Sequence, residues 1–224
     1  MLPFLIGGAA AILTGVGAAI YKYCWEDESN AASATVSLKR FAIWGRPDVG
    51  KTTFIARLRG RPVDAGRKEA STSRQVYKDI PPISLDEKSY LIDEIVDMPG
   101  NKDRFADWLK LVSEYEHVFY LINLARAGDT DYQAGVRYDL KETMEELRRC
   151  QKDDKKLHII VSHIDESHLK NVNPNEINNA LHQDEFVRQF YEQVHGVKSY
   201  LYAANLVNEE NFRQLIQSIV RDTQ

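Results

Sequence analysis

One ten-residue stretch, WGRPDVGKTT at residues 44–53, constrains the fold of this chain more than any other. It matches the pattern GxxxxGK[ST], follows the apolar-rich run TVSLKRFAI and leads into FIARLRG, which has the spacing of a helix. A glycine-rich loop between a strand and a helix wraps its backbone N–H groups around a phosphate, and the helix adds the positive end of its dipole. The sequence therefore predicts a phosphate-binding loop within an α/β domain.

The residues of this loop have distinct expected roles. Lys51 reaches the β- and γ-phosphate oxygens, and the hydroxyl of Thr52 ligates Mg²⁺. The loop residues expected to contact the nucleotide are Gly45, Arg46, Pro47, Asp48, Val49, Gly50, Lys51, Thr52 and Thr53. A turn that only looks like this motif is the alternative, but the flanking strand and helix favour the functional interpretation.

A second motif, DMPG at residues 97–100, stands at the end of a predicted strand. A carboxylate at a strand tip, here Asp97, suits the coordination shell of Mg²⁺. Gly100 offers its N–H to a γ-phosphate and keeps the loop mobile. The two motifs together predict a site for a nucleoside triphosphate.

Apolar periodicity alternates between strand and helix along the body of the chain. Strands are predicted at 36–44, 88–97, 117–125, 157–162 and 197–203, with a sixth within 74–86. Helices are predicted at 51–60, 103–115, 132–153, 174–196 and 208–222. This order indicates an α/β fold with a mostly parallel six-stranded sheet and helices on both faces.

GRPDVGKTT together with DMPG resembles the Era and EngA branch of the translation-factor-class GTPases, whose loop reads GRPNVGKS and whose second motif reads DTPG. The resemblance covers residues 36–222. It implies a Ras-like P-loop G domain, GTP or GDP as the ligand, Mg²⁺ as the cofactor and switch loops that respond to the nucleotide.

The resemblance also assigns residues to the first switch and to guanine recognition. Thr72, within STSR, takes the place of the switch threonine that binds Mg²⁺, with Ser73 as the alternative. SHID at residues 162–165 stands where the family reads guanine. There Asp165 accepts hydrogen bonds from guanine N1–H and N2–H₂, which rejects adenine, and His163 stacks on the base.

The last family motif falls on AAN, residues 203–205. At this place the family uses a backbone N–H to hold guanine O6. The resemblance therefore implies that Ala203 and Ala204 line the base pocket and that Ala204 provides this N–H.

The residues at the two catalytic positions differ from those of both Ras-like proteins and the Era-like branch. Asn101 stands where Ras-like proteins have a glutamine that orients water, and it is one methylene shorter. Asp48 stands where the Era-like branch has an asparagine that helps to hold K⁺. The expected catalytic residues are Lys51, Asn101 and Asp48, and the expected metal ligands are Thr52, Thr72 and Asp97. We expect slow GTP hydrolysis that needs a partner or dimerisation, with K⁺ as a candidate cofactor.

Residues 2–20 carry no charge and are long enough, at about 1.5 Å per residue, to nearly span a bilayer core of about 30 Å. We predict a transmembrane anchor at 1–25, a linker at 26–35 and a G domain at 36–224. A signal peptide cleaved after ASA at 32–34 is one alternative, but no basic region precedes the apolar run. A buried soluble helix is the other.

Basic residues flank this segment on one side only, namely Lys22, Lys39 and Arg40, which predicts a single-pass protein with its G domain in the cytoplasm. Gly7, Ala11 and Gly15 form a small-residue face that suits a homodimer, although such residues are common in membrane helices. The bilayer is thus one expected partner.

Composition excludes few other classes. The net charge of −4 gives no overall basic field for nucleic acid. The two cysteines match no disulfide framework, and Cys24 is a candidate for palmitoylation. The basic residues between 57 and 74 suit either anionic lipid or a solvated surface. HIDESH at 163–168 has metal-binding residue types but lacks a fourth ligand.

The leading hypothesis is a membrane-anchored GTP switch whose loops, 65–80 and 98–106, are read by an effector or activating protein. Its layout resembles that of the signal recognition particle receptor β subunit. The second hypothesis is a pseudo-GTPase that holds nucleotide and recruits partners to the membrane. A P-loop kinase for a small substrate is a third, disfavoured by the positions of the later motifs.

Overall fold

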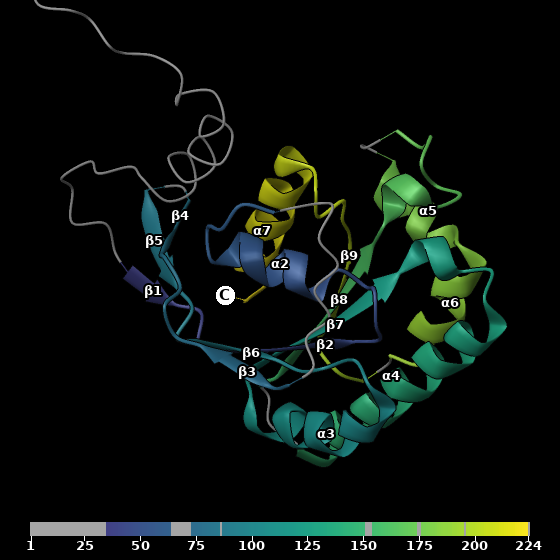
Figure 1. Ribbon diagram of the computed structural model, residues 1–224, viewed down its shortest axis with the longest axis horizontal. Helices are drawn as coiled ribbons and strands as arrows, with labels where there is room; N and C mark the ends of the chain where they lie inside the picture. Colours follow the sequence, from purple (N-terminus) through teal and green to yellow (C-terminus); the bar gives the residue numbers. More distant parts are fainter. Residues whose placement is uncertain are drawn as a thin grey trace, which may run out of the picture.

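The computed structural model describes residues 35–63, 73–85, 87–150, 154–173, 176–194 and 196–223. Its centre is a six-stranded sheet in the order β3-β6-β2-β7-β8-β9 (Figure 1). The strands are β2 (Arg40–Gly45), β3 (Gln75–Tyr77), β6 (Glu94–Asp97), β7 (His117–Asn123), β8 (Lys156–Ser162) and β9 (Ser199–Ala203). Only β3 pairs antiparallel, with β6. The predicted mostly parallel six-stranded sheet is confirmed.

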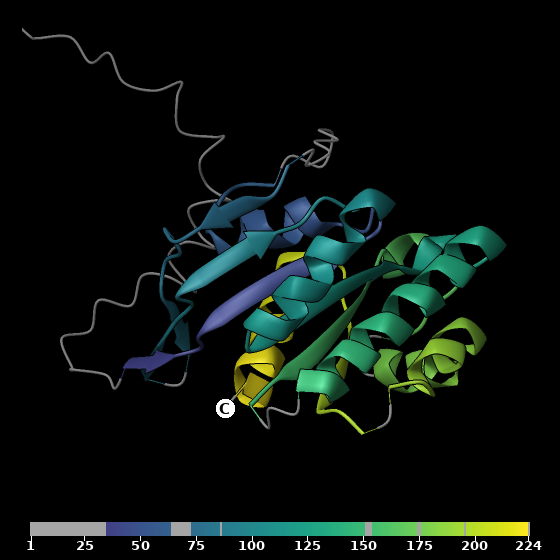
Figure 2. The same cartoon turned by 90° about the horizontal axis from the view of Figure 1, so that it is seen from below.

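Helices cover both faces of this sheet (Figures 1 and 2). The helices α2 (Lys51–Leu58) and α7 (Glu209–Thr223) lie on one face, where Phe54 packs against Phe119 and Phe212. The helices α3 (Phe105–Glu114) and α4 (Thr130–Cys150) lie on the other, where Trp44 stacks on Trp108. The central strand β7 is buried along its whole length. Its unbroken apolar run is explained by this double coverage.

The structure corrects two predicted strands. The expected strands at 36–44 and 88–97 are each split, and their first parts form a second sheet, ordered β1 (Thr35–Ser37), β5 (Lys88–Leu91) and β4 (Ile83–Leu85). Lys39 adopts a left-handed conformation with φ 62°, which ends β1, and its carbonyl accepts a hydrogen bond from the Asp93 N–H at 2.9 Å. The two chain segments therefore leave one sheet and enter the other side by side.

The predicted helix at 174–196 is also divided, into α5 (Ile177–Gln183) and α6 (Glu185–Tyr191). Asp184 between them has an extended backbone, and its carboxylate accepts a hydrogen bond from the Val187 N–H at 2.9 Å. An aspartate that caps the next helix competes with continuing the previous one. Short 3₁₀ helices occupy η1 (Lys102–Arg104), η2 (Leu124–Arg126) and η3 (Ile164–Glu166).

The predicted transmembrane segment at 2–20 and the linker up to residue 34 lie outside the described residues. In the ranges that the structure does describe, no helix is both long and apolar enough to cross a bilayer. The described part is the α/β body of the chain.

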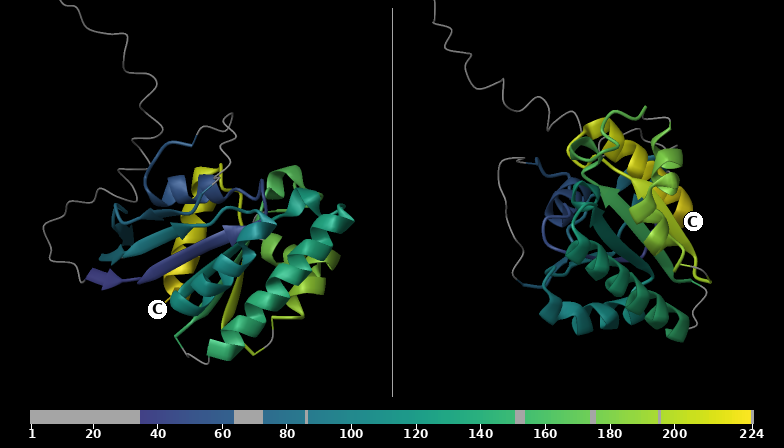
Figure 3. Two further views of the ribbon diagram at one scale, coloured as in Figure 1. Left: turned by 60° about the horizontal axis from the view of Figure 1, so that its bottom comes forward. Right: turned by 90° about the vertical axis from the view of Figure 1, so that its right-hand side faces the viewer.

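The topology gathers the loops that carry the sequence motifs. Because β2, β6, β7, β8 and β9 run parallel, their carboxyl ends meet at one edge of the sheet (Figure 3). Strand β2 lies between β6 and β7, and the order of the strands reverses there: β3 and β6 lie on one side of β2, and β7, β8 and β9 follow on the other. The loop after β2 therefore starts at this reversal point. Ligands of open α/β sheets bind at such a reversal point.

Candidate nucleotide-binding site

The loop between β2 and α2 has backbone conformations that its glycines permit. Gly50, the N-cap of α2, has φ 85°, and a Cβ there would lie 2.8 Å from Cδ1 of Leu206. A Cβ at Gly45 would lie 2.5 Å from the carbonyl oxygen of Leu121. Neither position accepts a side chain without movement of the surroundings. The two glycines of the motif are thus explained by the fold.

The first turn of α2 is open to an anion. Its N-cap makes no side-chain hydrogen bond, and the first turn contains no acidic residue. The N–H groups at the start of a helix lack intrahelical partners and carry the positive end of its dipole. A polyphosphate is the kind of ligand that such an end stabilises.

Side chains at the ends of two neighbouring strands hold the carbonyl groups of the loop. Nδ2 of Asn123, at the end of β7, donates to the carbonyl oxygen of Asp48 at 2.9 Å. Oγ of Ser162, at the end of β8, donates to that of Val49 at 2.9 Å. In a planar peptide the N–H points opposite to the carbonyl, so the N–H groups of Val49 and Gly50 point to the other side. These N–H groups form a nest of the kind that binds phosphate.

Lys51 lies at the centre of this loop. Its Nζ donates to the carbonyl oxygens of Gly45 at 2.8 Å and Arg46 at 3.0 Å, and its side chain is buried. Burial lowers the pKa of Lys51 to about 8, and the charges of Asp97 and Asp48 only partly offset this. A buried ammonium facing two acidic groups and a phosphate-binding loop is the arrangement expected for holding a polyphosphate.

The DMPG segment follows β6 and packs on the phosphate-binding loop, residues 45–52, which is called the P-loop below. Asp97 is buried at the end of the strand. The indole Nε1 of Trp44 donates to the carbonyl oxygen of Pro99 at 3.0 Å. A Cβ at Gly100 would lie 2.5 Å from the carbonyl oxygen of Gly45 and 2.8 Å from the nitrogen of Pro47. The glycine therefore lets the two loops meet backbone to backbone.

Thr52 and Thr53 occupy the first turn of α2, with Thr52 exposed and Thr53 half-buried. Asn101 is exposed immediately after Gly100. The predicted switch residue Thr72 lies outside the described residues, whereas its alternative, Ser73, is described and exposed. The loop residues and Asp97 are thus brought together, and Thr72 is not tested.

The loops after β8 and β9 approach the P-loop as the base-binding motifs require. His163 has a left-handed conformation, and its Cε1 lies 3.8 Å from the position of a Cβ at Gly50. Asp165, in η3, is exposed. Leu206, beyond β9, is the residue that would meet a Cβ at Gly50 at 2.8 Å. The arrangement brings the loop that carries SHID, the predicted guanine-reading motif, next to the P-loop.

The Ala204 N–H, the predicted donor to guanine O6, has a partner within the sheet. The Ala204 N–H donates to the carbonyl oxygen of Val161 at 2.9 Å and so extends the pairing of β8 with β9. The contact of this N–H with guanine O6 stays a prediction. Ala203 is half-buried at the end of β9.

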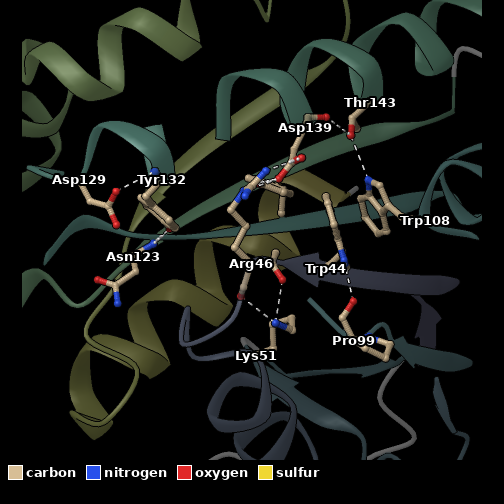
Figure 4. A network of polar contacts seen from close by, with 12 residues as sticks. Trp44, Arg46, Lys51, Pro99, Trp108, Asn123, Asp129, Tyr132, Asp139 and Thr143 are labelled. Atoms are coloured by element: carbon tan, nitrogen blue, oxygen red, sulfur yellow. Dashed lines mark hydrogen bonds and ion pairs between the residues drawn. The ribbon is translucent and has the colours of Figure 1, made fainter. Parts of the chain in front are cut away.

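Several residues that hold the site were not among the sequence-based assignments. Asp139 of α4 is one of them, and it pairs with the guanidinium of Arg46, a loop residue predicted to contact the nucleotide (Figure 4). Asn123, Ser162 and Trp44 hold loop carbonyls. Trp44 and Ser162 stand at the end of predicted strands, whereas Asn123 lies inside the predicted strand at 117–125. The sequence gives no further signal, because each side chain acts on a backbone carbonyl that carries no sequence information.

Comparison with known proteins identifies the family. The family model described as 50S ribosome-binding GTPase matches residues 40–180, which include both the P-loop and the DMPG segment. The chain belongs to this GTPase family. It contains a GTP-binding domain of the small-GTPase type.

A solved structure gives the same fold. The Arl6 BBS3 small GTPase from Trypanosoma brucei, with a bound nucleotide analogue, GppNp, has a TM-score of 0.56 and 13% sequence identity. The alignment covers 85% of this chain and 98% of that chain. At this identity the match shows the fold alone. No curated protein sequence matches the chain.

Proposed function

We propose that this protein is a membrane-anchored GTP-binding switch whose GTP hydrolysis is slow without a partner. The observation that carries the proposal is the P-loop itself. Asn123 and Ser162 hold two of its carbonyl groups. Its buried lysine donates to two others, those of Gly45 and Arg46. This geometry favours tight binding of a polyphosphate in a domain of a GTPase family.

The residues at the loop suit Mg²⁺. Thr52 supplies a hydroxyl at the start of α2, Asp97 a buried carboxylate at the end of β6, and Thr72 is the proposed third ligand. Oxygen donors of this kind are the ligands that Mg²⁺ prefers. When bound, the ion neutralises charge that develops on the β- and γ-phosphate oxygens.

Slow hydrolysis is supported by the residues at the two catalytic positions. Asn101 is exposed and shorter than the glutamine of Ras-like proteins. Burial lowers the pKa of Lys51, and the negative charge of Asp48 is close enough to offset a part of this. A carboxylate there opposes the build-up of phosphate charge, and we propose that an activating or effector protein at the switch loops completes the site.

Hydrolysis is tested by single-turnover measurements on the full-length chain, purified in mild detergent, in sodium and then in potassium buffer. We expect slow turnover in sodium, with any acceleration confined to potassium or to an added partner. Rapid unaided turnover in both buffers would refute this part of the proposal.

We further propose that residues 2–20 anchor the protein as a single-pass membrane protein with its G domain in the cytoplasm. Support comes from the uncharged segment and from Lys22, Lys39 and Arg40 beyond it. The test is flotation of the full-length chain with liposomes, against a chain lacking residues 2–20. Resistance of the bound protein to alkaline carbonate is expected, and release by carbonate contradicts an anchor.

A pseudo-GTPase scaffold is the second candidate function. Asp48 and Asn101 favour it because neither matches the residue of a fast enzyme. Nucleotide that stays bound through purification and is not hydrolysed over hours with any cation supports the scaffold.

The family description names a ribosomal subunit, but a net charge of −4 provides no overall basic field for RNA.

A further inference from the structure

The side chain of Arg46 joins the P-loop to helix α4. Its Nε donates to Oδ2 of Asp139 at 2.8 Å, and its Nη2 donates to Oδ1 at 3.0 Å (Figure 4). The Tyr120 hydroxyl, from β7, donates to the same Oδ2 at 2.8 Å. The side chains of Arg46 and Asp139 are 14% and 4% exposed. This is a bidentate, nearly buried ion pair with a third donor fixing the carboxylate.

Helix α4 is shaped to receive this guanidinium. Gly135 lies one turn before Asp139, and a Cβ there would lie 2.1 Å from Cζ of Arg46 and 2.3 Å from its Nη2. Glycine is a poor helix former, so its presence inside a long helix calls for a steric reason. The close approach of Arg46 supplies that reason.

The pair is fixed electrostatically as well as sterically. Burial is the largest single influence and lowers the pKa of Arg46, but the hydrogen bonds and the negative charge of Asp139, with Tyr120, together raise the pKa above its ordinary value. A buried pair of this kind is costly to break from one side, because the remaining charge is left without compensation. Two of the five N–H donors of Arg46 are committed to Asp139, so its guanidinium is directed at helix α4.

The main chain of Arg46 connects this pair to the phosphate-binding lysine. Its carbonyl oxygen accepts a hydrogen bond from Nζ of Lys51 at 3.0 Å. We propose that Arg46 and Asp139 are positioning residues, which hold the P-loop and Lys51 from helix α4 in the conformation that binds a nucleotide. The proposal rests on the proposed nucleotide binding and adds that the ion pair between Arg46 and Asp139 increases the affinity for the nucleotide.

The sharpest test uses Gly135→Ala, which improves helix propensity and fills only the space of the guanidinium. Its matched control is Gly128→Ala, because a Cβ at Gly128 meets nothing within 4 Å. Asp139→Asn removes the charge of the pair, and Arg46→Ala provides a background in which Gly135→Ala has nothing to displace. The measurement is the Kd for fluorescent GDP on the full-length chain in mild detergent.

We expect Gly135→Ala and Asp139→Asn each to raise the Kd by about tenfold, which corresponds to 1.4 kcal/mol. Gly128→Ala is expected to bind as the unchanged protein does. In the Arg46→Ala background, Gly135→Ala should add no further loss. A Gly135→Ala protein with the original Kd overturns the proposal, as does a full additional loss in that background.

Hydrogen exchange of the nucleotide-free protein separates positioning from general destabilisation. In Gly135→Ala the amides of residues 45–53 should exchange faster, while those of α7 stay unchanged. Faster exchange in both segments would mean a structural role only and would overturn the proposal. If the unchanged protein binds no GDP, the proposed function fails, and this nucleotide-free comparison still tests the positioning role.

Discussion

The side-chain amide of Asn123 donates a hydrogen bond to the main-chain carbonyl of Asp48 at 2.9 Å, which ties the middle of the P-loop to the end of β7. The same side chain accepts a hydrogen bond from the Ala125 N–H through Oδ1 at 2.9 Å. Both ends of the amide are thus held, so the carbonyl of Asp48 has one preferred direction. Through this hydrogen bond, strand β7 orients the middle of the P-loop.

Replacing Asn123 with alanine should weaken nucleotide binding. Losing one buried hydrogen bond and leaving a carbonyl without its partner costs about 1–2 kcal/mol, equivalent to a roughly five- to thirtyfold higher Kd. Calorimetric titration with GDP measures this. Asn178→Ala, on the exposed face of α5, is the matched control. Equal Kd values for the two variants would contradict the anchoring role.

The depressed pKa of Lys51, about 8, predicts how pH acts on binding. Above pH 8 the free protein loses the Lys51 proton, whereas a bound polyphosphate favours the charged form. Binding therefore takes up a proton, and the Kd for GDP should rise above pH 8 by up to about tenfold per pH unit. Titrations at pH 7.5, 8.5 and 9.5 test this. Lys51→Met should bind GDP weakly, with a Kd that does not change with pH. A Kd of the unchanged protein that is constant with pH contradicts it.

The same shift predicts the stability of the nucleotide-free protein. The folded-state pKa lies below the ordinary value of 10.5, so the unfolded chain holds more protons between about pH 8 and 10.5. The contribution of Lys51 to stability therefore rises with pH through this window. The difference between the unchanged protein and Lys51→Met in chemical denaturation isolates it, and a difference that falls with pH would have the wrong sign.

Gly100→Ala should lower the affinity for GTP more than that for GDP. The added Cβ meets backbone atoms of Gly45 and Pro47, so the DMPG segment must move away from the P-loop. If the Gly100 N–H serves a γ-phosphate, the loss is about 1.5–3 kcal/mol, or more than about tenfold in Kd. The ratio of GTP to GDP affinities is the measurement. An unchanged ratio would show that Gly100 only packs the loops.

Asp48→Asn tests why hydrolysis is slow. Asp48 has φ 61°, a left-handed conformation that asparagine also tolerates, so the loop should keep its shape. Removing the negative charge beside the polyphosphate should tighten GTP binding several-fold. It should also make single-turnover hydrolysis faster in potassium than in sodium. Rates equal to those of the unchanged protein in both buffers would assign the slow step elsewhere.

The fold was predictable because its signals are local and repeated. A glycine-rich loop between a strand and a helix fixes one strand end, and the continuous apolar run at 117–123 indicates a strand buried on both faces. The break between β5 and β6 was not predictable. It depends on the pairing of Asp93 with Lys39, two residues far apart in the sequence.

The site was predictable only in its motif residues. Motif spacing identifies Lys51, Asp97 and the loop glycines. Asp139, in contrast, is one of several acidic residues in a charged helix. Nothing in its spacing shows that Arg46 reaches it. Likewise, the pairing of the Ala204 N–H with Val161 is a matter of strand register, which one sequence does not give.

Binding of guanine nucleotides at the P-loop is measured by calorimetric titration of the full-length protein with GDP, GTP and ATP in the presence of Mg²⁺, beside Lys51→Ala. We predict binding of GDP and GTP, with ATP weaker by at least about a hundredfold because Asp165 pairs with guanine but not adenine. Lys51→Ala should lose this binding. Failure to bind either guanine nucleotide, or equal affinity for ATP, would contradict this prediction.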